Sequence, residues 1–182
     1  SNLNRDLSIA LGSSGVSLLE LVRAYSVFNN LGYLVTPVFI TKILDRDGNV
    51  IEEAELVREK VIEESTAYIM TSLLEGVVKH GTGRRVLALK RPVAGKTGTT
   101  DDYKDAWFTG FTPSLCVSVW TGFDKNKRLK STQGAGISGG MGATPIWADF
   151  MINAMKGEPE RDFMIPNHIR FEKVDPVSGC AP

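Results

Sequence analysis

Apolar side chains recur at helical spacing in three stretches of the chain, and the first two have clear ends. The first stretch starts after Ser17, which forms an S-x-x-E capping box with Glu20, and it ends at Gly32. The second covers about residues 65–77, with acidic residues before it, basic residues in its last turn, and Gly81 after it. Two amphipathic helices are therefore predicted.

A third helix is predicted near the C-terminal end of the chain. Thr144 is the expected N-cap and Pro145 the first helical residue, since proline is favoured at that position. The predicted apolar face consists of Ile146, Trp147, Phe150, Met151 and Ala154. From about residue 156 the chain is irregular and contains several prolines.

Strand-like runs occupy the space between these helices: residues 38–44, 49–52, 94–100, 106–112 and 115–123. Asp47-Gly48 predicts a hairpin between the first two, and Pro113-Ser114 a tight turn between the last two. The order of helix, hairpin, helix, three strands and helix predicts an α/β (α+β) fold. We expect antiparallel core strands with the 145–155 helix packed on one face.

Composition narrows the possible functions. The chain has 182 residues, 42% of them hydrophobic, and 21 basic side chains balance 21 acidic ones. This suits one globular domain and argues against nucleic-acid binding, which needs a basic surplus. Two cysteines, Cys116 and Cys180, make no disulfide framework, and His80 and His168 make no zinc site. No membrane span, metal or cofactor is predicted.

Two glycine-rich stretches resemble phosphate- or nucleotide-binding loops. Gly95-Lys96-Thr97 suggests a P-loop, but Lys90 stands where that motif requires glycine, and another strand follows instead of a helix. Gly134 to Gly139 matches G-x-G-x-x-G, but a polar basic run, not a strand, precedes it. Neither stretch therefore predicts a nucleotide site.

The second glycine-rich stretch also contains G-x-S-x-G around Ser138. Asp149 or Asp162, followed by His168, gives the chain order of an α/β-hydrolase triad. That motif needs a strand directly before the serine and a helix directly after it, and the sequence predicts neither. A flexible loop before a helix is the simpler interpretation, and a serine hydrolase stays open as an alternative.

The segment Lys96-Thr97-Gly98-Thr99 suits one wall of an acyl-transfer site. A lysine ammonium and threonine hydroxyls bind a carboxylate, and glycine lets a ligand approach the backbone closely. A backbone N–H at a strand edge is a natural oxyanion donor. An ordinary edge strand with one exposed lysine is the competing interpretation.

At these residues the sequence resembles the transpeptidase domain of penicillin-binding proteins, especially the bifunctional class A type. K-T-G belongs to the motif set of that family. Further similar segments are Ser8 to Ser13, Val78 to Gly83, Asp105 to Phe108, Gly110 to Pro113, Trp120 to Asp124, Gly139-Gly140, Ala143 to Trp147 and Val174 to Gly179. The resemblance thus extends over most of the chain.

The resemblance implies a parent enzyme that cross-links peptidoglycan through a serine acyl-enzyme formed on a D-alanyl-D-alanine stem peptide. β-Lactams would acylate the same serine, at the extracytoplasmic face of the bacterial membrane. Lys96 would line the site, and Thr97 and Thr99 would offer hydroxyls to the substrate carboxylate. The Thr99 N–H would be an oxyanion donor, and Gly98 would keep the strand edge clear.

The chain departs severely from the family pattern, because two of its motifs are missing. None of its 13 serines has lysine three residues later or asparagine two residues later, so neither S-x-x-K nor S-x-N is present. We therefore expect residues 1–156 to be the C-terminal portion of a transpeptidase domain, and 157–182 a tail or the start of another segment. Without a nucleophile, no catalytic residue is predicted, the isolated chain should be inactive, and its uncovered apolar surface should favour self-association. A non-catalytic binding module of the same fold stays open.

Overall fold

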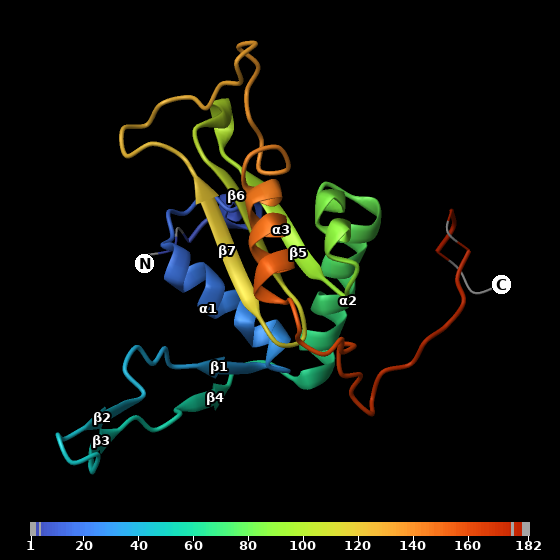
Figure 1. Ribbon diagram of the computed structural model, residues 1–182. Helices are drawn as coiled ribbons and strands as arrows, with labels where there is room; N and C mark the ends of the chain where they lie inside the picture. The colour runs from blue at the N-terminus through green and yellow to red at the C-terminus, as the bar shows by residue number, and fades with distance from the viewer. Residues whose placement is uncertain (1–2, 4, 176, 180–182) are drawn as a thin grey trace.

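A three-stranded antiparallel sheet lies at the centre of the structure (Figure 1). In this computed structural model, which describes residues 3, 5–175 and 177–179, the sheet order is β5 (Ala94–Thr99), β6 (Ala106–Phe111) and β7 (Cys116–Thr121). All three strands and their antiparallel pairing were predicted from the sequence, and both are confirmed.

Strand register divides the side chains of β6 between the two faces of the sheet. Phe108 pairs with Thr97 of β5 and Val119 of β7, and its ring is fully buried. Phe111, three residues later, points to the other face because strand side chains alternate. Since both faces carry buried aromatic rings, both need a covering layer.

Helix α1 (Leu18–Asn29) helps to cover the Phe111 face. Its predicted capping box is present, with the Glu20 N–H donating to Ser17 Oγ at 3.2 Å and the Ser17 N–H donating to the Glu20 carboxylate at 2.8 Å. Gly32 follows the helix with φ +93°, the left-handed conformation predicted for a glycine at the end of a helix. Tyr25 and Phe28 of α1 pack against the cluster that contains Phe111.

The opposite face is covered by α3 (Ala143–Ala154), the C-terminal part of α2 (Glu64–His80) and the 3-10 helix η2 (Arg84–Leu89). Trp147 of α3 is fully buried, contacts the Phe108 ring edge to face at 5.2 Å, and donates from its indole to the Val117 carbonyl at 3.0 Å. The prediction that this helix packs on the sheet through Trp147 is confirmed.

The predicted start of α3 is wrong by two residues. Gly142 is the N-cap, and Thr144 lies inside the helix, where its buried hydroxyl donates to the Gly139 carbonyl at 2.9 Å. The helix begins early because the Gly139 carbonyl also accepts the N–H groups of Ala143 and Thr144. Ile146 and Phe150, placed on the apolar face by the sequence pattern, are each about half exposed, at 51% and 52%.

A two-part hairpin arm leaves the body between α1 and α2 (Figure 1). At its base β1 (Tyr33–Val35) pairs with β4 (Arg58–Lys60), which the sequence did not predict, and at its tip β2 (Lys42–Leu44) pairs with β3 (Val50–Glu53). The predicted strand 38–44 forms only at its last three residues. Residues 38–41 have no ladder partner among the described residues, so their apolar composition alone does not make them a strand.

The remaining described segments are short or irregular. They include the 3-10 turns η1 (Leu7–Leu11) and η3 (Asp101–Tyr103), and the described part of 157–179 holds no helix or strand. Cys180 lies outside the described residues. Within the described part of the chain, no helix is long and apolar enough to cross a membrane.

Candidate functional site

The K-T-G segment lies on β5, the edge strand of the sheet. The Thr100 N–H donates to the Asp105 carbonyl at 3.1 Å, and hydrogen-bonded pairs alternate with non-bonded pairs along an antiparallel ladder. Thr99–Ala106 and Thr97–Phe108 are therefore non-bonded pairs. It follows that the Thr99 N–H and the Thr97 carbonyl point away from β6, toward the outer edge.

The polar side chains of this segment gather at the same edge. The exposed Lys96 ammonium donates to the Thr97 carbonyl at 2.9 Å and lies 3.4 Å from the Thr97 hydroxyl. That hydroxyl is hydrogen-bonded to the hydroxyl of Thr82 at 2.7 Å. The hydroxyls of Thr82 and Thr97 and the Lys96 ammonium thus converge at this edge, whereas the Thr99 hydroxyl oxygen accepts the Gly139 N–H.

Thr82 was not predicted as a site residue. It follows the C-terminal end of α2 and stands 15 positions before Thr97 in the sequence. No local pattern connects the exposed Thr82 with the partly buried Thr97, because they lie in different segments. The segment 78–83 was noticed only as part of the family resemblance.

Gly139 joins the end of β5 to the start of α3. Its N–H donates to Thr99 Oγ1 at 3.0 Å, and its carbonyl accepts the buried Thr144 hydroxyl. A β-carbon at this position would lie only 2.4 Å from the carbonyl oxygens of both Gly98 and Trp107. Glycine is therefore required for this close approach to the sheet, and the contact fixes the Thr99 side chain.

The turn after β5 is also tightly held. The Thr100 hydroxyl donates to the Asp105 carboxylate at 3.1 Å, and the same carboxylate accepts the Trp120 indole N–H at 2.9 Å. Between them, Asp102 and Tyr103 both have positive φ values, +59° and +56°. Two successive non-glycine residues in the left-handed region are uncommon and mark a backbone conformation imposed by its surroundings.

Cys116 is not a nucleophile in this fold. It lies on β7, partly buried against α1, where its Sγ is 3.8 Å from the Val22 carbonyl. Burial raises the pKa of this thiol to about 12. Because the thiolate is the reactive form, Cys116 is unreactive at neutral pH.

The alternative glycine-motif sites do not form. Lys96 and Thr97 lie within a strand that a second strand follows, so there is no P-loop helix. Ser138 lies in a loop with no strand directly before it, and His168 is exposed in the C-terminal region. Within the described residues, neither Asp149 nor Asp162 bonds His168, and His168 does not bond Ser138. The hydrolase triad is thus not assembled.

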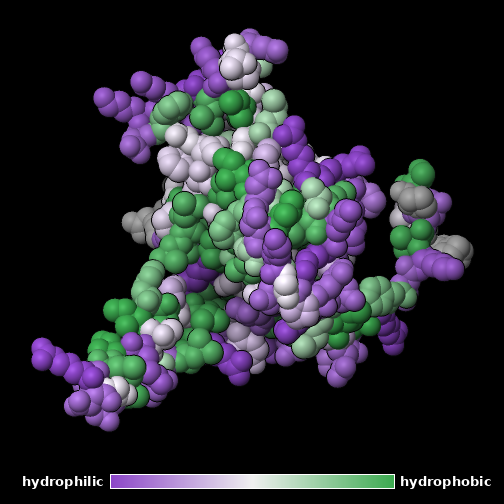
Figure 2. Space-filling model, in the orientation of Figure 1, coloured by the Kyte–Doolittle hydropathy of each residue, from purple (hydrophilic) through white to green (hydrophobic). Residues whose placement is uncertain are grey.

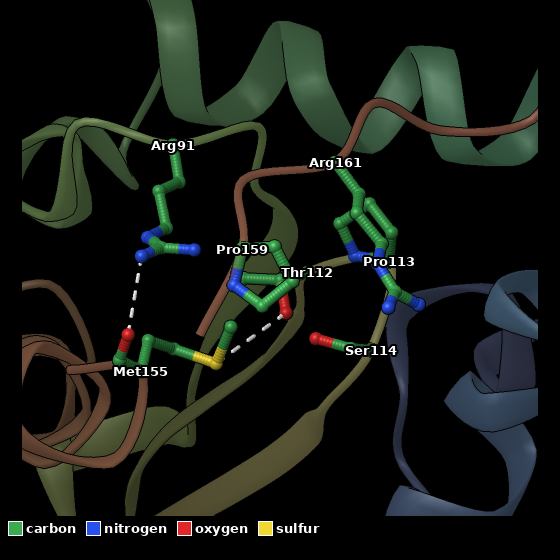
Figure 3. A pocket seen from close by; sticks show the side chains of 7 residues that line it. All are labelled: Arg91, Thr112, Pro113, Ser114, Met155, Pro159 and Arg161. Atoms are coloured by element: carbon green, nitrogen blue, oxygen red, sulfur yellow. Dashed lines mark hydrogen bonds between the residues drawn. The ribbon is translucent and has the colours of Figure 1, made fainter. Parts of the chain in front are cut away.

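A small pocket occurs at the opposite end of β6 from Thr99 (Figure 3). Its lining residues are Arg91, Thr112, Pro113, Ser114, Met155, Pro159 and Arg161. The Arg91 guanidinium donates to the backbone carbonyls of Met155 and Glu158, at 3.1 and 2.7 Å. Arg91 therefore holds the segment after α3 against the body, which is a structural role. Among the described residues, no cluster of three metal-ligating side chains occurs.

The fold is that of a penicillin-binding transpeptidase. A crystal structure of penicillin-binding protein 1A from Haemophilus influenzae superimposes with a TM-score of 0.88 and 29% identity, over 96% of this chain and 32% of that one. The PonA1 protein of Mycobacterium tuberculosis, solved in complex with penicillin V, gives a TM-score of 0.78 and 30% identity, over 89% of this chain and 44% of that one.

Sequence comparison gives the same result. The penicillin binding protein transpeptidase domain matches residues 2–137, and the chain belongs to that family. Penicillin-binding protein 1A of Aquifex aeolicus is 44% identical over 165 residues, covering 91% of this chain and 22% of the relative. The protein of the same name from Pseudomonas aeruginosa is 37% identical, over 97% of this chain and 27% of its own length. The chain therefore spans about a quarter of these relatives.

Proposed function

We propose that the outer edge of β5 is the substrate-binding wall of a D-alanyl-D-alanine transpeptidase that cross-links peptidoglycan stem peptides at the extracytoplasmic face of the membrane. In this proposal residues 1–156 form the C-terminal portion of the transpeptidase domain, and 157–182 are a tail or the start of a following segment. The serine and lysine of S-x-x-K come from a segment outside this chain. β-Lactams bind to the same wall.

The observation that carries this proposal is the direction of the Thr99 N–H. It points to the outer edge, where it can donate to the oxyanion that forms when a serine attacks a peptide or β-lactam carbonyl. The Thr97 hydroxyl and the Lys96 ammonium lie along the same edge, where they can hold the substrate carboxylate. Gly98, between Thr97 and Thr99, leaves the backbone accessible.

Thr82 is the positioning residue of this wall. Its hydroxyl lies 2.7 Å from the Thr97 hydroxyl. This hydrogen bond uses one donor or acceptor site of Thr97 and so restricts the directions in which Thr97 can form its remaining hydrogen bonds. Either hydroxyl can donate in this pair; when Thr82 donates, the proton of the Thr97 hydroxyl is directed away from Thr82 and can be donated to a carboxylate.

The test is a chimera in which this chain replaces the matching segment of the Aquifex aeolicus penicillin-binding protein 1A. Lys96→Ala should lower the second-order rate of penicillin acylation by roughly 100-fold, a loss of the size seen when one preorganised hydrogen-bond donor of an active site is removed. Thr82→Val should lower it by about tenfold. Lys90→Ala, a control outside β5, should leave the rate unchanged. Acylation that is independent of Lys96 would contradict the proposal.

A further inference from the structure

We propose that the basic loop after β7, centred on Arg128, binds a carboxylate on the amino-terminal side of the scissile bond of the peptide. The inference rests on the proposed function, because that function sets the direction in which a peptide lies along β5. It names a further element of substrate specificity, an acidic group that penicillin does not possess at this position.

The direction of the peptide follows from the two roles assigned on β5. If the terminal carboxylate is held near Lys96 and Thr97 and the scissile carbonyl meets the Thr99 N–H, the carboxyl end of the peptide points toward Ala94. The residues before the scissile bond then continue past Thr99 in the opposite direction. They run toward the turn Asp101–Tyr103.

A strongly basic loop is attached to that turn. Residues 125–130 contain the exposed cations Lys125, Lys127, Arg128 and Lys130. The Leu129 N–H donates to the Tyr103 carbonyl at 2.7 Å, and the Arg128 guanidinium lies 5.4 Å from the centre of the Tyr103 ring. In Figure 2 hydrophilic side chains project from this end of the molecule, beyond the sheet.

The other side of the loop returns to β5. The Gly136 backbone lies so close to the Tyr103 ring that a β-carbon there would stand 2.4 Å from it, and Gly139, three residues later, donates to Thr99. The loop therefore runs from Arg128 across Tyr103 to the proposed oxyanion site. An extended peptide advances about 3.3 Å per residue, so a few residues before the scissile bond bring it over this turn.

The charges around Tyr103 favour an anion on the loop. Asp102 of the turn lies 3.8 Å from the Lys104 ammonium, and Asp105 accepts from Thr100 and Trp120. Asp101 and Asp124 are the other acidic groups in these segments, and both are exposed. Arg128 makes no ion pair within the described residues. Its planar guanidinium, stacked on Tyr103, suits bidentate binding of a carboxylate.

The experiment compares two D-alanyl-D-alanine peptides with the chimera described above. One carries a free carboxylate two residues before the scissile bond, and the other carries a carboxamide at the same position. Arg128→Gln should lower kcat/KM for the carboxylate peptide by up to about fivefold, the upper limit for an exposed charged contact. It should change kcat/KM for the carboxamide peptide, and the rate of penicillin acylation, by less than about twofold. Lys156→Gln, at the far end of α3, is the matched control and should change none of the three.

The outcomes separate the two proposals. Equal losses with both peptides, or none, would overturn the inference while Lys96-dependent acylation by penicillin still supported the proposed function. If penicillin acylation did not depend on Lys96, both the proposed function and this inference would be contradicted. If Arg128→Gln abolished co-sedimentation with phosphatidylglycerol vesicles but left the two peptides alike, the loop would be a lipid-binding surface, and the peptide assignment would be wrong. The same peptides titrated into the 182-residue chain, followed by NMR at the Arg128 Nε–H, give a second readout without catalysis.

Discussion

The backbone N–H of Gly139 donates to the side-chain oxygen of Thr99 at 3.0 Å, across 40 positions of sequence. This bond ties the loop before α3 to the end of the K-T-G strand. Because the Gly139 carbonyl also accepts the buried Thr144 hydroxyl, the position of Thr99 is linked to the packing of α3. The end of β5 is thus linked, through the Gly139 loop, to the buried core around α3.

Substitution of Gly139 tests that link. Gly139→Ala places a methyl group 2.4 Å from two sheet carbonyls, so the loop must move, and the free energy of unfolding should fall by about 1–3 kcal/mol. The matched control is Gly76→Ala in α2, where a β-carbon meets nothing within 4 Å and alanine should stabilise the helix by about 0.5–1 kcal/mol. Urea unfolding should show a lower free energy of unfolding for Gly139→Ala and a higher one for Gly76→Ala. Equal effects of the two substitutions would refute the packing described here.

Thr144 gives a second test of the same link. Thr144→Val keeps the shape of the side chain but removes the hydroxyl that donates to Gly139, and should cost about 1 kcal/mol. Thr144→Ser retains the donor and should lose less stability than the valine variant. If Thr144 acted as the N-cap that the sequence indicated, valine would instead expose a helical N–H, and amide exchange in the first turn of α3 would rise sharply.

These two residues also show where prediction from sequence succeeds and fails. The capping box Ser17–Glu20 was recognisable because its partners are three residues apart. Thr144 looked like an N-cap by the same local rule, but the Gly139 carbonyl, five residues earlier in the adjoining glycine-rich loop, supplies the first turn with an acceptor. The K-T-G strand was predicted from residue types alone. The Thr82–Thr97 contact was not, because it depends on how α2 ends against the sheet.

The base of the hairpin arm was missed for a related reason. Strands β1 and β4 are three residues each, too short to show an alternating pattern, and the arm between them separates the two partners. The predicted face of α3 failed at Ile146 and Phe150, which are half exposed although they continue the helical apolar pattern. Periodicity identifies apolar positions, and only the neighbouring elements decide which of them become buried.

Stability should decrease at alkaline pH because of Cys116. Burial raises the pKa of its thiol from 9.0 to about 12, so the stabilising effect is complete below pH 9 and is lost as pH rises from about 9 toward 12. In a Cys180→Ser background, Cys116→Ala should flatten this part of the stability curve. Burial also raises the pKa of Tyr25, so a smaller slope should persist above pH 10. Urea midpoints between pH 8 and 11 provide the measurement, and an unchanged slope would contradict it.

The isolated chain should self-associate through its hairpin arm. Phe39, Ile40, Ile51 and Leu56 on this arm are 83%, 64%, 66% and 70% exposed, and Figure 2 shows apolar surface over this region. Patches of this kind mark interaction surfaces. Light scattering should show a mass that rises with concentration, and Phe39→Ser with Ile51→Ser should reduce it. Ile146→Ser on α3, outside the arm, is the control. A monomer at all concentrations would contradict this prediction.

The central claim is that the chain supplies a substrate-binding wall and not the nucleophile. Intact-mass spectrometry after incubation with excess labelled penicillin tests it most directly, on two proteins side by side. The 182-residue chain should show no covalent adduct, and the chimera with the Aquifex aeolicus protein should show one adduct per molecule that forms far more slowly in Lys96→Ala. A stoichiometric adduct on any serine of the 182-residue chain would contradict the account, and an adduct on Ser138 would support the hydrolase instead.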